Sequence, residues 1–198
     1  MTNTMGTVAA GVERRTSAGY LPGRPGIWFF IIGDLLIFGV YFVCYMVYRG
    51  QNHGLFLESQ QHLNQQIGVV NTIILLTSSL LVALGTEAAR TENNRDAFRL
   101  FGAALAVGAL FPLLKLSEWI PEISAGLTPG KNMFFMFYYV MTGLHLIHVV
   151  LGLAIIGYVV DDLRSPKPSI RFAETGAMYW HMVDVLWLVL FAVFYLMR

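Results

Sequence analysis

The chain has 198 residues, of which 56% are hydrophobic and 13% are charged, and its formal net charge at pH 7 is +1. Soluble domains average about 25% charged residues, whereas the apolar residues here are gathered into long runs. A bilayer core needs roughly 20 apolar residues per helix, so the composition predicts an all-α, multi-span membrane protein. The balanced charge does not indicate a nucleic-acid partner, and the single cysteine, Cys44, excludes an internal disulfide and a cysteine-rich metal site.

Residues 1–25 form a polar N-terminal tail, and residues 26–198 are predicted to form a single domain of five transmembrane helices. The tail has no apolar core of the kind that a cleaved signal peptide contains. Hydropathy predicts the spans at about residues 27–48, 67–89, 98–119, 133–160 and 175–197. Pro121 is expected to close the third span. The connections are short and polar, so none of them is expected to hold an aqueous catalytic domain.

Lysine and arginine are distributed unequally between the two sides that five spans would define. The tail side carries nine: Arg14, Arg15, Arg24, Arg90, Arg95, Arg99, Arg164, Lys167 and Arg171. The other side carries Arg49, Lys131 and Arg198, while Lys115 lies inside the third span. The positive-inside rule therefore predicts a cytoplasmic N-terminus and an external C-terminus in a bacterial inner membrane.

Several ionisable or polar side chains lie within the predicted spans. A charge at the bilayer centre costs roughly 3 kcal/mol on insertion scales, so such groups usually face a bundle interior, a cavity or a partner. The candidate polar network comprises Asp34, Asn71, Lys115, Glu118, His145, His148, His181 and Asp184. Lys115 and Glu118, His145 and His148, and His181 and Asp184 are each three residues apart, so the members of each pair share a helix face.

Depth in the bilayer, at about 1.5 Å per residue, groups some of these side chains. Asp34, His181 and Asp184 lie at similar depths, so they could share one layer and hydrogen-bond there; depth does not establish rotation about the helix axis, which leaves the contact of Asp34 with His181 and Asp184 open. Lys115 and Glu118 lie nearer the outer side, level with Asn71.

Two functional readings compete with a structural role for these groups. His145, His148 and His181 have the ligand type that suits zinc or a non-haem iron pair. Di-iron bundles, however, use Glu-x-x-His motifs, and the spans contain none. The second reading is a proton relay, which would need proton-carrying groups at every depth of the bilayer. A small proton-coupled transporter is a further, separate alternative. We expect interhelical hydrogen bonds, with no catalytic residue and no metal ligand in this chain.

Five stretches of the sequence together resemble a known family. They are PGIWFFIIGDLLIF (25–38), NTIILLTSSLLVALG (71–85), PLLKLSEW (112–119), HLIHVVLG (145–152) and YWHMVDVLWLVLF (179–191). In this order they resemble successive helices of subunit III of haem–copper oxidases. The stretches from residue 23 to 42 and from residue 56 to 79 look most like the five-span NorE-type proteins associated with nitric oxide reductase.

The resemblance implies a non-catalytic accessory subunit of a respiratory complex, with no activity expected from the chain alone. Haem and a metal centre would belong to a catalytic partner subunit, and bound phospholipid is expected. Asp34 matches a family position that holds a buried glutamate near lipid, so it becomes a candidate for lipid binding or proton uptake. NorE-type partnership in denitrification is the first expectation. The alternatives are subunit III of a cytochrome c or quinol oxidase, and a stand-alone metal-dependent membrane enzyme using His145, His148 and His181.

Overall fold

The computed structural model describes residues 25–197, and these residues form helices joined by short connections. The elements are α1 (Pro25–Gln51), α2 (His53–Gln60), α3 (Gln65–Arg90), α4 (Asn94–Gly108), α5 (Leu110–Ser124), α6 (Met133–Asp162), α7 (Ile170–Phe191) and the π-helix η1 (Ala192–Leu196). Five stretches are long and apolar enough to cross a membrane: α1, α3, α4 with α5, α6, and α7 with η1. The predicted all-α, five-span fold is therefore confirmed. The predicted tail, except its last residue, lies outside the described residues.

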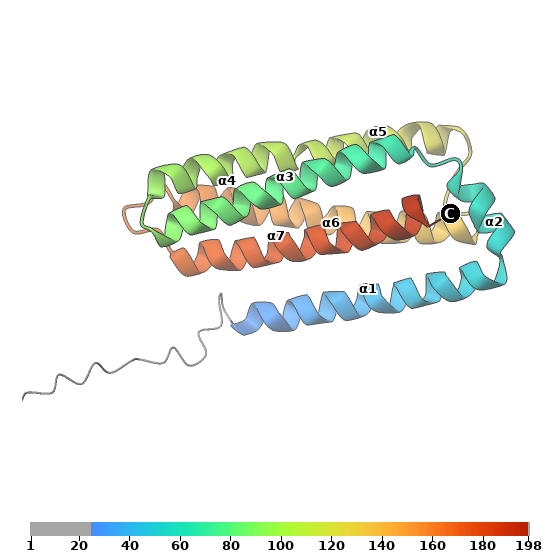
Figure 1. The fold of residues 1–198 in the computed structure, drawn as a ribbon, viewed down its shortest axis with the longest axis horizontal. Helices are drawn as coiled ribbons and strands as arrows, with labels where there is room; N and C mark the ends of the chain where they lie inside the picture. Colours follow the sequence, from blue (N-terminus) through green and yellow to red (C-terminus); the bar gives the residue numbers. More distant parts are fainter. Residues whose placement is uncertain (1–24, 198) are drawn as a thin grey trace, which may run out of the picture.

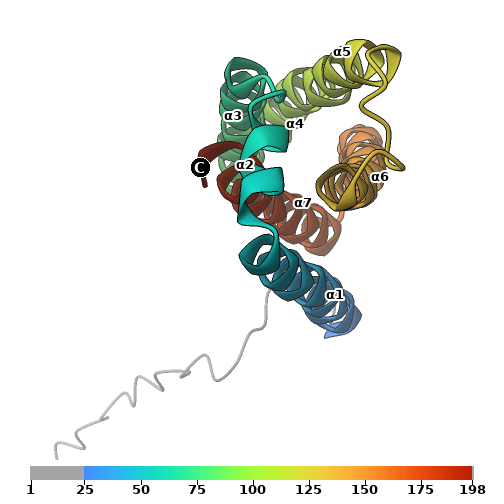
Figure 2. The same cartoon turned by 90° about the vertical axis from the view of Figure 1, so that its right-hand side faces the viewer.

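The long helices run side by side along the long axis of the molecule (Figure 1). Viewed end-on, α3, α4 with α5, α6 and α7 form a ring in which α7 packs against α3 and α6, while α1 lies to one side against α7 and α6 (Figure 2). We call the end with Arg90, Arg95 and Arg171 the basic end. The other end carries α2 and η1, and we call it the C-terminal end. The described chain starts at the basic end and stops at the C-terminal end (Figure 1).

The third span is interrupted at Ala109, between α4 and α5. Pro112 explains the position of this break, because its ring has no N–H donor and clashes with the carbonyl of the residue four positions earlier, Gly108. Pro121, by contrast, lies inside α5, which continues to Ser124. The prediction that Pro121 closes the span is therefore wrong: a single proline removes one hydrogen bond without ending this helix.

The connection between the first two long helices contains a helix that hydropathy did not predict. Helix α2 has eight residues, is rich in polar side chains, and places Phe56 fully inside the molecule. Phe56 meets the Tyr45 and Phe134 rings edge to face, at centroid distances of 5.3 and 5.7 Å. Because one buried ring and the hydrogen bonds of Ser59 and Gln60 fix α2 against the bundle, its short sequence carries no periodic apolar signal.

The end of the fifth span is a π-helix rather than a continuation of α7. The Met197 amide donates to the Ala192 carbonyl at 3.0 Å, a bond from residue i+5 to residue i. Carbonyl groups that this turn displaces are satisfied from α2, since the Gln60 amide donates to Val193 O and Phe194 O at 3.1 and 3.2 Å. The changed pitch turns both Phe194 and Tyr195 into the molecule, where they are at most 2% exposed.

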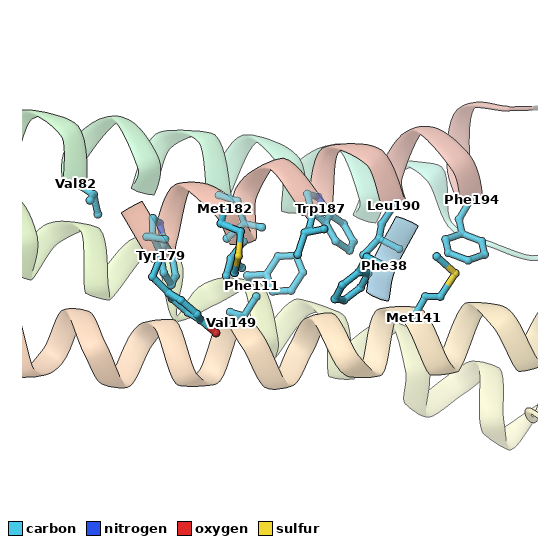
Figure 3. Packing of buried hydrophobic residues seen from close by; sticks show 14 of the residues in the cluster. Phe38, Val82, Phe111, Met141, Val149, Tyr179, Met182, Trp187, Leu190 and Phe194 are labelled. Carbon is cyan, nitrogen blue, oxygen red and sulfur yellow. The ribbon is translucent and has the colours of Figure 1, made fainter. Parts of the chain in front are cut away.

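Helix α7 forms the centre of the core, and α1 forms its edge. Side chains of α7, including Trp187 and Leu190, point into the space between α7 and α6 (Figure 3). Of the most apolar window of each helix, 61% is buried in α7 but only 6% in α1. Most of the apolar surface of α1, including the 83% exposed Phe29, is therefore left for lipid or a partner protein.

Candidate functional site

The C-terminal half of the bundle holds a buried polar cluster around Lys115, which is fully buried. Its ammonium group donates to Glu118 Oε2 at 2.7 Å and to the hydroxyls of Tyr138 at 2.9 Å and Tyr195 at 2.7 Å. The Tyr195 hydroxyl in turn donates to Glu118 at 2.8 Å. The cluster thus joins α5, α6 and η1 through charge-assisted hydrogen bonds, which are the stronger kind in a low-dielectric interior.

Glu122, which sequence reasoning did not single out, extends this cluster by one helical turn. It is 7% exposed and accepts a hydrogen bond from the Tyr139 hydroxyl at 3.2 Å. Tyr138, Tyr139 and Tyr195 were also missed, because tyrosine is common in apolar spans and gives no signal there. Only the Lys115–Glu118 spacing pointed to this region.

The middle of the bundle contains polar groups without hydrogen-bond partners in the described part of the chain. His145 stacks on the Trp187 ring at a centroid distance of 5.3 Å, and both of its ring nitrogens are buried and unbonded. Both polar atoms of the Asn71 amide are also buried and unbonded. The neighbouring Thr72 hydroxyl does have a partner, since it accepts from Trp187 Nε1 at 3.0 Å.

Asp34 contacts His148 on α6, not His181 on α7 as depth had suggested. The Asp34 Oδ2 and His148 Nε2 atoms are 3.4 Å apart, and the two side chains are 14% and 16% exposed. The other ring nitrogen of His148 lies 2.7 Å from the Leu144 carbonyl, which orients the imidazole toward α1. The question that depth left open, whether Asp34 meets His181 and Asp184, is thus answered by the rotation of the helices, which turns Asp34 toward His148.

His181 and Asp184 do not bond to each other either. His181 Nδ1 lies 2.6 Å from the Ser79 hydroxyl of α3, whereas both carboxylate oxygens of Asp184 are buried without a hydrogen bond within residues 25–197. Near the basic end, Arg90 bonds to the 5% exposed Glu174 at 2.9 Å. These contacts tie α3 to α7.

We expect Asp184→Leu to leave the thermal stability unchanged or to raise it. The change removes a buried carboxyl group whose polar neighbour, the Ser79 hydroxyl, is shared with His181, and burying such a poorly compensated group costs free energy. Ser79→Ala should instead lower the unfolding free energy by about 0.6 kcal/mol, the average for a hydrogen bond between membrane helices. Thermal melts of both purified variants would check this. A larger loss in Asp184→Leu than in Ser79→Ala would show that Asp184 has a stabilising partner.

The three histidines proposed as alternative metal ligands face different neighbours: Trp187, Asp34 and Ser79, respectively. In the described part of the chain, no group of three or more His, Cys, Asp and Glu side chains is placed to hold a metal ion. Within residues 25–197, the three histidines are therefore not brought together around one point.

Fold and polar clusters together define a five-span membrane protein whose ionisable groups mostly connect its helices. Residues 16–198 match the family described as cytochrome c oxidase subunit III. A relative from Synechocystis sp., cytochrome c oxidase subunit 3, is 34% identical over 176 residues, covering 87% of this chain and 74% of the relative. The chain therefore belongs to the cytochrome c oxidase subunit III family.

Two further relatives show how widely this similarity extends. The cytochrome c oxidase subunit 3 of Corynebacterium diphtheriae is 30% identical over 207 residues, which cover both proteins completely. The heme-copper oxidase subunit I+III of Aeropyrum pernix is 29% identical over 184 residues, covering 87% of this chain but only 22% of the relative. The chain thus resembles one part of a longer polypeptide whose name joins two subunits.

Proposed function

We propose that this chain is a non-catalytic accessory subunit of a haem–copper oxidase superfamily complex in a bacterial inner membrane. The observation that carries the proposal is the similarity to one part of the fused subunit I+III. A fusion holds its two parts in one assembly, so a separate chain of the subunit III type is expected to bind a subunit of the subunit I type. The exposed apolar surface of α1 agrees with such a partner.

Two kinds of complex are candidates for this partnership. The names of the relatives favour a terminal oxidase, with haem and the metal centre in its catalytic subunit. The stretches 23–42 and 56–79 favour the NorE type, and hence nitric oxide reductase. In either complex the chain would support the stability, maturation or sustained turnover of the catalytic subunit.

A pull-down of the tagged chain from its native membrane in mild detergent tests the proposal. We expect a haem absorbance spectrum in the eluate and a multi-span haem protein among the co-eluting proteins. Mass identification of that protein decides between the oxidase and nitric oxide reductase. A colourless eluate without a co-eluting membrane protein would contradict the accessory role.

We also propose that the chain is oriented in the membrane with its basic end in the cytoplasm. A protease-cleavable tag placed after Arg198 should then be removed by protease added outside intact spheroplasts. The same tag placed before Met1 should be protected. The reverse pattern would overturn the orientation that the positive residues predict.

We also propose that phospholipid binds along α7. An apolar groove of about 300 Å³ between α1 and α7 is lined mainly by Trp28, Ile31, Leu35 and Met182. A second cavity of about 240 Å³, between α3 and α7, contains Arg90 and Thr86. Because His181 and Met178 line both, an acyl chain in the groove would lie beside the Arg90–Glu174 ion pair and the Thr86 hydroxyl, which offer both charges to a zwitterionic lipid head group.

Asp34→Ala is expected to reduce the phospholipid that copurifies with the chain, while leaving the haem spectrum of the complex intact. Without the Asp34–His148 contact, α1 loses a polar attachment to α6, and α1 forms one wall of the groove. Phosphorus analysis of the purified complex measures the retained lipid. Thr77→Ala, an exposed polar position outside the groove, is the control. Unchanged lipid in Asp34→Ala, or loss of the haem spectrum, would contradict this role.

A further inference from the structure

The charges of the buried cluster around Lys115 do not balance. All three N–H donors of its ammonium group are used, by Glu118, Tyr138 and Tyr195. An ammonium group has three donors, so none remains for a second carboxyl group. The positive charge of Lys115 is committed to Glu118, which is 2% exposed.

Glu122 is the second carboxyl group of the cluster, four residues after Glu118 and thus on the same face of α5. Only 7% of Glu122 is exposed. Among the described residues, no lysine, arginine or histidine nitrogen lies within ion-pair distance of it. Its hydrogen-bond donor is the uncharged Tyr139 hydroxyl. Two carboxylates, Glu118 and Glu122, would therefore share the single positive charge of Lys115. Because buried charge without full compensation costs several kcal/mol, the cluster is one positive charge short when both are ionised.

That charge can reach Glu122 from outside the molecule. A partly open cavity of about 260 Å³ lies at the C-terminal end between α3 and α5 and is lined by Glu118 and Glu122. The same cavity is lined by Ser117, Asn64 and His62, which can hydrogen-bond water. The cavity is large enough for several waters, and therefore gives Glu122 a path to the aqueous phase at this end.

We propose that Glu122 binds a single proton and exchanges it with the aqueous phase through this cavity. The groups that face it are Lys115 and Glu118 from α5, Tyr138 and Tyr139 from α6, Tyr195 from η1, and His62 across the cavity. With the proton bound, the cluster holds one cation and one anion. When the proton leaves, a second negative charge appears one turn from Glu118. The charge of the cluster therefore follows the pH on the C-terminal side.

Infrared difference spectroscopy of the purified full-length chain at a series of pH values tests this proposal. The C=O stretch of a protonated carboxylic acid should be present at neutral pH and should disappear as the pH rises. Glu122→Gln should lower the intensity of that pH-dependent band while the chain remains folded, and any band that remains belongs to another buried carboxyl group, that of Asp184. Glu58→Gln, a change of an exposed carboxyl group on α2, should leave the band as in the unchanged protein.

Two results would overturn the proposal. One is a pH-dependent band whose intensity is the same in Glu122→Gln as in the unchanged protein, which would assign the proton to another carboxyl group such as Asp184. The other is the absence of any such band together with a melting temperature that rises when sodium or potassium chloride is added. In this case Glu122→Gln would abolish the rise in melting temperature. That combination would show that a metal cation, not a proton, supplies the missing charge. The test uses the chain without a partner and is therefore independent of the pull-down.

Discussion

Replacing Lys115 by methionine is expected to destabilise the protein more than any other single change in its polar core. The substitution keeps much of the side-chain volume but leaves Glu118 buried and without its cation. Removing one partner of a buried ion pair typically costs about 3–5 kcal/mol. We therefore expect a large fall in the melting temperature and in the yield of monodisperse protein after detergent extraction.

A second variant separates the loss of charge pairing from a general effect of substitution. Lys115→Met combined with Glu118→Gln removes both charges, and it should recover most of the lost stability, because replacing a whole buried pair is often neutral. Lys131→Met, at an exposed position, should have little effect. Equal instability of the single and double variants would show that Lys115 acts through packing against Tyr138, Tyr195 and Trp187, not through its charge.

Gly152→Leu is expected to disrupt the packing of α6 against α7. The Trp180 ring lies between two glycines, so that a Cβ atom added at Gly152 or at Gly108 would be only 2.8 Å from the ring. The ring cannot move away from one helix without meeting the other. Overpacking of this kind costs about 1–3 kcal/mol, and we expect the upper end of that range in thermal or denaturant unfolding.

Gly102→Leu is the matched control for this change. Gly102 is also in a helix, but a Cβ atom added there would meet nothing within 4 Å. Since glycine in a helix interior is destabilising by roughly 0.5–1 kcal/mol relative to alanine, the control should be neutral or stabilising. A Gly152→Leu protein as stable as Gly102→Leu would show that α6 and α7 can separate without loss.

The five spans could be predicted from the sequence because each depends on a local property, a long run of apolar residues. The spacing of Lys115 and Glu118 was equally local, and the two side chains do bond. The partners of Asp34 and His181 could not be predicted in this way. Each contact depends on how a helix is rotated about its axis, which hydropathy and depth leave undetermined.

Short irregular elements could not be predicted either, because they too depend on contacts between residues far apart in the sequence. The π-helix η1 is stabilised by Gln60, which is 133 residues from Val193 in the chain. No pattern within residues 192–196 indicates that contact. Glu122 was overlooked because it follows Pro121, which was expected to end the helix. Its burial becomes evident only when α5 is seen to continue and Tyr139 of α6 is placed against it.

The turn at η1 also has a consequence for how the protein is made. Tyr195 follows Lys115 by 80 residues, so Lys115 and Glu118 are synthesised well before their hydroxyl partner exists. The hydrogen bonds of Lys115 and Glu118 with Tyr195 can therefore form only once η1 has been synthesised. The polar core is thus completed by residues 192–196, which join the cluster only after α5 and α6 have been made.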